Sequence, residues 1–235
     1  MIKQIFLGLV IATLARAEAQ EAASLSQLPQ ASLAVPASQH SAAPRPARAN
    51  FQGESASSDT RRMADWVVAS ADHGSMPFVI VDKKDAKVFV FDHQGQILGA
   101  APALLGLAVG DDSAPGVGDK PLSAIAPKDR TTPAGRFIGY LGHDPGKPNF
   151  LWVDFKNNIS LHRVVHGNPK DHRFERLATP TPLDNRISFG CINVPVDFFE
   201  RTVLPTFKGA KGVVYILPEI KPTRAFFPKY YDVND

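Results

Sequence analysis

Short apolar runs rich in β-branched and aromatic side chains recur along the chain from residue 78, and turn residues separate them. The runs at 78–81, 87–91 and 96–98 are joined by a Lys-Lys-Asp turn and an Asp-His-Gln-Gly turn. Because tight turns join neighbouring antiparallel strands, this pattern predicts an antiparallel meander. Further strands are predicted through Ile138 and Tyr140 and at 150–155, 159–165 and 212–217.

Helical periodicity is limited to two segments. Residues 60–72 place Met63, Trp66 and Val67 on one face, and residues 196–204 have a similar spacing. About seven strands without β-α-β alternation favour a single, mainly β domain. We therefore predict a bent β-sandwich or barrel-like domain with one or two short helices.

The predicted domain covers residues 60–217, with its core at 76–217. The tail, 218–235, is broken by prolines but contains four aromatic residues, so we expect it to pack on the domain surface. Glycine and aspartate are frequent at 106–129, which predicts a long loop or lid.

Residues 1–19 have the order of a secretory signal: Lys3, an apolar stretch from 5 to 15, and small-x-small cleavage sites. Eleven apolar residues are too few to span a bilayer. We therefore predict cleavage of the signal, export to the periplasm and no stable membrane insertion afterwards. Residues 20–59 are rich in Ala, Ser and Pro and poor in large apolar side chains, which predicts a disordered tether.

Charge and loop composition exclude two classes of ligand. The net charge is +3 and the basic residues are scattered, which argues against a dedicated nucleic-acid binder. The glycines of the 106–129 loop lack the G-x-x-x-x-G-K-[ST] spacing of a phosphate-binding loop.

Cys191 is the only cysteine of the chain, and the small residues Ser188 and Gly190 precede it. Exported proteins commonly pair their cysteines in disulfides, which a single cysteine cannot do within the chain. An unpaired thiol beside small residues is therefore predicted to be a nucleophile. The alternative is a buried, unreactive cysteine that packs as a small apolar residue.

A thiol nucleophile needs a base, because the thiolate is the reactive form. The nearest preceding histidines are His162, His166 and His172. We favour His162, because a base on a strand is held more rigidly than one on a loop, and His166 is the alternative. With Cys191 these histidines could also supply zinc ligands. However, His162 and His166 are four apart on a β-type run rather than a helix, so we predict no metal and no cofactor.

Positive charge precedes the cysteine at Arg173, Arg176 and Arg186. Arginine would lower the pKa of the thiol and could hold a substrate carboxylate, although ordinary solvated charge explains at least two of the three. The backbone N–H groups of Gly190 and Cys191 are candidate oxyanion donors. The residues predicted to bind substrate or the oxyanion are Ser188, Gly190, Asn193 and Arg186.

Two motifs and the strand histidine resemble the L,D-transpeptidases with a YkuD-type catalytic domain. The motifs are Ser188-Phe189-Gly190-Cys191-Ile192-Asn193 and Thr132-Pro133-Ala134-Gly135-Arg136-Phe137, and the resemblance covers about residues 76–217. It implies a mostly β catalytic domain in which Cys191 forms a thioester with a peptidoglycan stem peptide and the strand histidine is the general base. An amine acceptor would then take the acyl group, in a cross-link or in attachment of another protein. Acylation by carbapenems is also implied.

The chain departs from that family at three points. Phe189 stands where the family usually has a histidine. The family's histidine is usually followed by Gly or Ser and then Thr, which His166-Gly167-Asn168 mimics, while His162-Arg163-Val164 keeps the strand position. The segment between the base and the cysteine is longer than usual, which suggests an enlarged lid. Two further functions stay open: hydrolysis at the same site, as an L,D-carboxypeptidase or an enzyme that detaches wall-linked proteins, and a non-catalytic peptidoglycan-binding relative.

Overall fold

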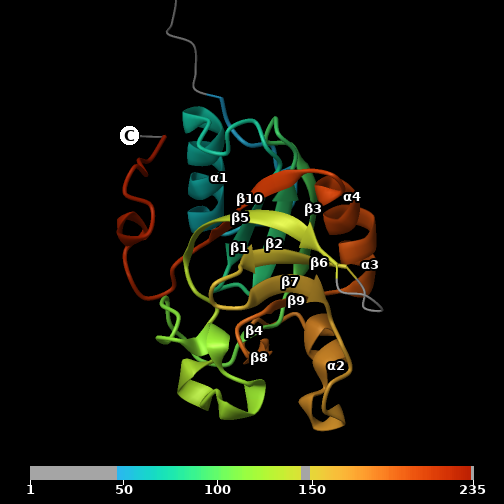
Figure 1. The fold of residues 1–235 in the computed structure, drawn as a ribbon. Helices are drawn as coiled ribbons and strands as arrows, with labels where there is room; N and C mark the ends of the chain where they lie inside the picture. Colours follow the sequence, from blue (N-terminus) through green and yellow to red (C-terminus); the bar gives the residue numbers. More distant parts are fainter. Residues whose placement is uncertain (1–46, 144–148, 234–235) are drawn as a thin grey trace, which may run out of the picture. The chain divides into compact units, whose positions relative to one another are not determined.

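A computed structural model describes residues 47–143 and 149–233 (Figure 1). Its main sheet has eight strands in the order β3-β2-β1-β10-β5-β6-β7-β9. These strands are β1 (Phe78–Asp82), β2 (Lys87–Phe91), β3 (Ile97–Pro102), β5 (Gly135–Gly142), β6 (Phe150–Asp154), β7 (Ile159–Arg163), β9 (Ile192–Val194) and β10 (Lys211–Ile216). A small parallel sheet pairs β4 (Leu105–Gly106) with β8 (Arg186–Ser188). The predicted class, a mainly β domain with a bent, barrel-like sheet and few short helices, is confirmed.

The first three strands form the predicted antiparallel meander, with Val79 opposite Val90 and Val81 opposite Val88. Side chains alternate between two buried clusters on the two faces of the sheet. One cluster includes Val79 and Val81, and the other includes Phe78. Because both faces are covered, these strands are continuously apolar instead of alternating with polar residues.

Helices cover the two faces. Helix α1 (Ser58–Ser70) packs Met63 and Trp66 into one cluster, and the hydroxyl of Ser57 caps it by accepting from the Thr60 N–H at 3.1 Å. The opposite cluster is covered by a continuous helical segment whose parts are α3 (Val196–Phe198), a π-helical turn (Phe199–Val203) and α4 (Leu204–Phe207). Both predicted helices are therefore present. No helix of the described residues is long and apolar enough to cross a membrane.

The predicted tether is wrong at its C-terminal end. Phe51 is buried and its ring lies 5.2 Å from that of Phe91, edge to face. Asn50 donates its N–H to Gly95 at 2.9 Å and accepts from Ile97 at 2.9 Å. One large aromatic side chain in an otherwise small and polar stretch is enough to join this segment to the core. The predicted signal at 1–19 and the tether up to residue 46 lie outside the described residues.

Two later segments complete the domain. In the tail, Phe227 is buried against Trp66, with ring centres 6.4 Å apart, so the tail packs on the domain as predicted. The long connection between β7 and β8 contains helix α2 (Arg173–Ala178), which the hydrophobic pattern did not indicate because Leu177 is its one buried residue.

Candidate active site

Strand pairing brings the cysteine and a histidine together from distant parts of the chain. Strand β9 lies parallel to β7, with Asn193 opposite His162, and Cys191 immediately precedes β9. On the other side of β7, Ser160 lies opposite Trp152 of β6. Because residues two apart in a strand share a face, Ser160 and His162 present their side chains on the same side of the sheet.

The Cys191 thiol is half-buried and has two weak polar contacts. Its sulfur lies 3.7 Å from the Ser160 hydroxyl oxygen, and the thiol donates to the Asn158 carbonyl oxygen at 3.7 Å. Asn158 has a left-handed backbone with φ of 58°, which asparagine tolerates better than most residues. This turn between β6 and β7 therefore places a carbonyl oxygen beside the sulfur.

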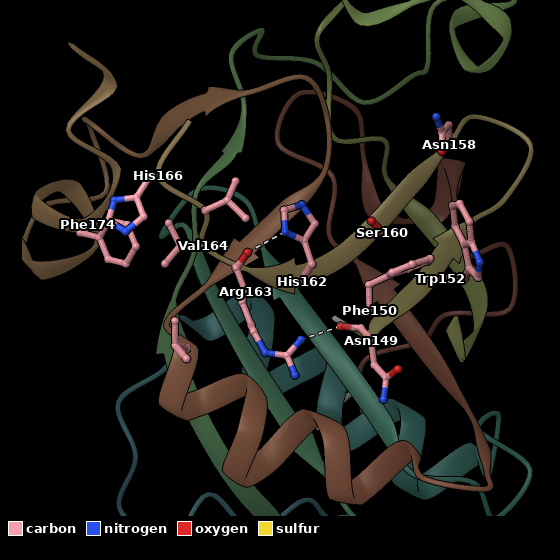
Figure 2. A pocket seen from close by; sticks show the side chains of 12 residues that line it. Asn149, Phe150, Trp152, Asn158, Ser160, His162, Arg163, Val164, His166 and Phe174 are labelled. Atoms are coloured by element: carbon pink, nitrogen blue, oxygen red, sulfur yellow. Dashed lines mark hydrogen bonds between the residues drawn. The ribbon is translucent and has the colours of Figure 1, made fainter. Parts of the chain in front are cut away.

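The ring of His162 is held in one tautomer. Its Nδ1 lies 2.6 Å from the carbonyl oxygen of Arg163, as Figure 2 shows. A carbonyl oxygen only accepts, so Nδ1 carries the proton and Nε2 carries the lone pair. Burial lowers the pKa of His162, but its interaction with the Cys191 thiol raises it more, so the pKa lies above its ordinary value.

The pKa of Cys191 moves in the opposite direction. Burial raises the pKa of the thiol, but its interaction with His162 outweighs this effect, and the backbone and hydroxyl of Ser160 lower the pKa as well. The result is a thiol pKa below its ordinary value. A lowered thiol pKa beside a raised imidazole pKa favours a thiolate–imidazolium pair, the form in which cysteine is nucleophilic.

Among the described residues, neither of the other two histidines is a hydrogen-bond partner of the sulfur. His166 is exposed and its ring packs on Phe174, with centres 4.6 Å apart. His172 is exposed at the N-terminus of α2, with a left-handed backbone. Among the described residues no group of three or more histidine, cysteine, aspartate or glutamate side chains could hold a metal ion.

The loop before the cysteine is shaped by Ser188 and Gly190. Ser188 is buried; its hydroxyl donates to the Cys191 carbonyl at 2.6 Å and accepts from the Gly190 N–H at 3.1 Å. Gly190 has φ of 128°, and an added Cβ would lie 2.7 Å from Ile159, so only glycine fits. The Ser188 hydroxyl therefore stabilises this turn, and substrate binding by Ser188 stays a prediction.

The two predicted oxyanion donors, the N–H groups of Gly190 and Cys191, differ in whether they already have a hydrogen-bond partner. Because the Gly190 N–H already donates to Ser188, it is not a free donor in this structure. For the Cys191 N–H we find no hydrogen-bond partner within the described residues. Of the two predicted oxyanion donors, the Cys191 amide is therefore the one without a partner among those residues.

Asn193 lies beneath the site. It is 1% exposed, and its side-chain amide donates to the Cys191 carbonyl at 3.3 Å. Its side-chain carbonyl accepts from Arg173 at 3.2 Å. Asn193 therefore holds both the cysteine loop and one arginine, and its contact with substrate stays a prediction.

Of the three arginines, Arg173 affects the titration of His162. Its positive charge lowers the pKa of His162, although the interaction with Cys191 raises that pKa more. Arg176 donates to the carbonyls of Asp171 and Asp184 at 2.6 and 2.5 Å. Substrate binding by Arg186 stays a prediction.

Arg186 joins a buried cluster of charges. It pairs with Glu219 of the tail and donates to the Lys83 carbonyl at 2.8 Å. Lys83 has no exposed side-chain surface, and its ammonium donates to Asp111 at 2.8 Å and to the Thr132 carbonyl at 3.0 Å. The acidic partners are far from Arg186 and Lys83 in sequence, so only the fold reveals the cluster.

Thr132 connects this cluster to the cysteine loop. Its hydroxyl donates to the Gly190 carbonyl at 2.8 Å and accepts from the Gly106 N–H at 2.8 Å. An added Cβ on Gly106 would lie 2.4 Å from the Arg130 carbonyl oxygen, so the two backbones pack closely. Thr132, buried in the Thr-Pro turn, therefore fixes the position of the residue just before Cys191.

Phe189 contacts the long loop at 106–129 and its flank. The Arg130 guanidinium lies 4.0 Å from the centre of the Phe189 ring, and its Nε donates to the Ile125 carbonyl at 3.0 Å. Arginine over an aromatic face is attractive. In this chain, Phe189 therefore attaches the loop to the cysteine segment.

A cavity of about 690 Å³ opens beside His162 and Ser160, which both line it (Figure 2). The figure shows Trp152 and Phe150 to one side of His162, and Phe174 with His166 to the other. The rings of Phe150 and Trp152 meet edge to face with centres 5.0 Å apart. Sequence reasoning missed these aromatic residues and Ser160. The alternation of 159–165 was the available signal, because it places Ser160 on the His162 face.

No family model matches the sequence, and no curated protein matches it. The solved structures with which the chain aligns are mostly L,D-transpeptidases, together with the helical cell shape determining protein Pgp2 from Campylobacter jejuni. For Pgp2 the identity is 18%, the alignment covers 62% of this chain and 49% of Pgp2, and the TM-score is 0.39. For an L,D-transpeptidase from Mycobacterium smegmatis the values are 15%, 60%, 58% and 0.34.

For the catalytic domain of the Enterococcus faecium L,D-transpeptidase the identity is 14%, with 61% of this chain and 98% of that domain covered and a TM-score of 0.34. The chain spans about half the length of the Pgp2 structures. At these identities and TM-scores, the assignment of the site rests on the chain's own residues.

Proposed function

We propose that this protein is an exported cysteine acyltransferase that forms a thioester with a peptidoglycan stem peptide and transfers it to an amine during cell-wall remodelling. One observation carries the proposal: a lone thiol with a lowered pKa lies beside an imidazole whose tautomer is fixed by a backbone carbonyl. A nucleophile, an activating base and a group that orients the base are the parts that acyl transfer requires.

The chemistry follows from these positions. The Cys191 thiolate attacks the substrate carbonyl carbon, and the resulting oxyanion accepts a hydrogen bond from the Cys191 N–H. The imidazolium of His162 gives its Nε2 proton to the leaving amine as the carbon–nitrogen bond breaks, which leaves a thioester. An acceptor amine then attacks the thioester, His162 removes its proton, and the thiolate departs.

The substrate class is supported by the sequence motifs and by the cavity. The Ser188-to-Asn193 and Thr132-to-Phe137 motifs resemble those of enzymes that act on stem peptides. Both motifs have a structural role in this chain, because Thr132 binds the Gly190 carbonyl and Ser188 binds the Cys191 carbonyl. The cavity of about 690 Å³ lined by His162 and Ser160 has a volume in the range of ligand sites.

The test is acylation of the purified protein by tetrapeptide muropeptides, followed by mass spectrometry. We expect an adduct on Cys191 and, with an amine acceptor present, a cross-linked product; the control Cys191→Ala should form neither. Hydrolysed peptide without cross-linked product would identify the hydrolase. Absence of both adduct and product, with binding to sacculi kept by Cys191→Ala, would identify a non-catalytic binding protein.

Export is tested separately. We propose that residues 1–19 direct export to the periplasm and are removed there. N-terminal sequencing of protein from the periplasmic fraction should begin near residue 20. Accumulation of uncleaved protein in the cytoplasm would contradict the proposal.

A further inference from the structure

Ser160 is the side chain beside the sulfur that the acyl-transfer scheme leaves without a role. It lies on β7, two residues before His162 and on the same face, and it lines the cavity. Its hydroxyl oxygen is 3.7 Å from the Cys191 sulfur. Within the described residues, that sulfur is the only hydrogen-bond partner of this hydroxyl.

The neighbours of the sulfur differ in what they can do after deprotonation. The Asn158 carbonyl accepts from the thiol, and it has no proton to give a thiolate. His162 can donate once it is protonated. The Ser160 hydroxyl can rotate, so it accepts from the thiol or donates to the thiolate as required.

We propose that Ser160 is a second catalytic residue, whose hydroxyl donates a hydrogen bond to the Cys191 thiolate and stabilises it together with His162. The contrast with Ser188 supports this role, because the Ser188 hydroxyl is bonded to backbone groups of its own turn. Phe189, next to Gly190, offers no polar group to the sulfur and instead contacts Arg130. The neighbouring strand therefore supplies the second donor that the cysteine segment lacks.

This role has a specific kinetic consequence. Loss of the donor raises the pKa of the thiol, so less thiolate is present at low pH. The thiolate that forms is more basic and hence more nucleophilic, with a Brønsted coefficient of about 0.4–0.5. For a pKa increase of about one unit, alkylation should be ~3-fold slower at low pH and ~3-fold faster above the thiol pKa.

The experiment measures the rate of Cys191 alkylation by iodoacetamide as a function of pH. Because the chain has one cysteine, every adduct reports this site. Ser160→Ala should give a profile that crosses that of the unmodified protein. Ser123→Ala, the same change at an exposed loop position, should leave the profile unchanged. A Ser160→Ala profile that coincides with that of the unmodified protein, or that is slower by a constant factor at all pH values, would overturn the proposal.

A second pair of variants separates the hydroxyl from packing. Ser160→Thr keeps the hydroxyl, and Ser160→Val has the same shape without it. The threonine variant should give the same pH profile of alkylation as the unmodified protein. The profile of the valine variant should cross that of the unmodified protein. Identical profiles for the two would also contradict the proposal, even if the alanine variant does not fold.

The catalytic role of Ser160 rests on the proposed acyl transfer, but its hydrogen bond to the thiolate does not. The two proposals can therefore fail independently. Alkylation needs no acyl substrate. A crossing profile without any acyl-enzyme would leave Ser160 as a thiolate donor and refute acyl transfer. Acyl-enzyme formation with parallel profiles would support acyl transfer and refute the role of Ser160 as a thiolate donor.

Discussion

Two sets of ionisable groups contact the segments that hold Cys191, and they are built in opposite ways. Lys83, Asp111 and Glu219 form a buried cluster with 0%, 1% and 6% of their side-chain surfaces exposed. Cys191 and His162 are half-buried, and His162 lines a cavity. The buried cluster reaches the cysteine loop through Thr132.

The difference lies in how fully each group is bonded. Asp111 accepts from Lys83 and from three tail amides at 2.7–3.0 Å, and the Lys83 ammonium also donates to two backbone carbonyls. Charges that are bonded on all sides are stable when buried and unavailable for chemistry. The Cys191 sulfur has only contacts of 3.7 Å, and His162 keeps Nε2 free of backbone bonds. The buried charges therefore stabilise the positions of the segments that they join. Cys191 and His162 have fewer hydrogen bonds, which leaves them able to react.

The largest effect should come from the base. His162→Gln removes the proton acceptor and should slow acylation about 10²–10⁴-fold, which is the usual contribution of a general base. His166→Gln should change the rate less than about threefold, because that ring lies against Phe174. Stopped-flow or mass-spectrometric acylation rates with muropeptides measure both. A larger loss for His166→Gln would reverse the assignment.

Next in size is the loss of the buried ammonium. Lys83→Met leaves two buried carboxylates short of a partner and should lower the free energy of unfolding by about 3–5 kcal/mol. The neighbouring Lys84→Met, which removes a 55% exposed side chain, should change it by less than about 1 kcal/mol. Urea unfolding followed by circular dichroism compares the two. Equal losses would show that the cluster does not stabilise the fold.

Acid should weaken the buried cluster before it weakens the rest of the sheet. Burial raises the pKa of Asp111, but hydrogen bonds from the tail amides and Lys83 outweigh this effect and lower the pKa to about 2. Because the folded-state pKa lies below the ordinary value, the stabilisation is complete above about pH 5 and is lost as the pH falls towards 2. About 2 kcal/mol should disappear over that interval.

Asp111→Asn provides the control for this pH dependence, because an amide does not titrate there. Its free energy of unfolding should start lower than that of the unmodified protein and should fall less steeply with acid. Unfolding by urea at a series of pH values measures both slopes. Parallel slopes would mean that Asp111 does not contribute to acid sensitivity.

The smallest effect should come from the contact between the loop and the cysteine segment. Phe189→Ala removes the ring under Arg130 and should lower the free energy of unfolding by about 1–3 kcal/mol, of which the cation–π contact supplies about 0.5–1 kcal/mol. A double-mutant cycle with Arg130→Met isolates that contact. A coupling of zero would show that Phe189 acts through packing alone.

Much of the fold was predictable because its signals are local. The apolar runs and their turns predicted β1, β2 and most of the other strands, since strand periodicity and turn chemistry act over a few residues. Helix α2 escaped notice because only one of its side chains is buried. The start of the ordered domain was also predicted too late. Phe51 packs against aromatic residues of β2, which lie about 40 residues further along the chain.

At the site, the sequence by itself determined which residue types are present. It contains one cysteine, a strand histidine and a glycine that the turn before the cysteine requires. Tertiary structure decided how each is used. The parallel pairing of β7 with β9 placed His162 near the sulfur, and strand register placed Ser160 beside it. Arg186 is closer to Cys191 in the sequence than His162 is, but it pairs with Glu219, because the strength of an ion pair depends on distance in space.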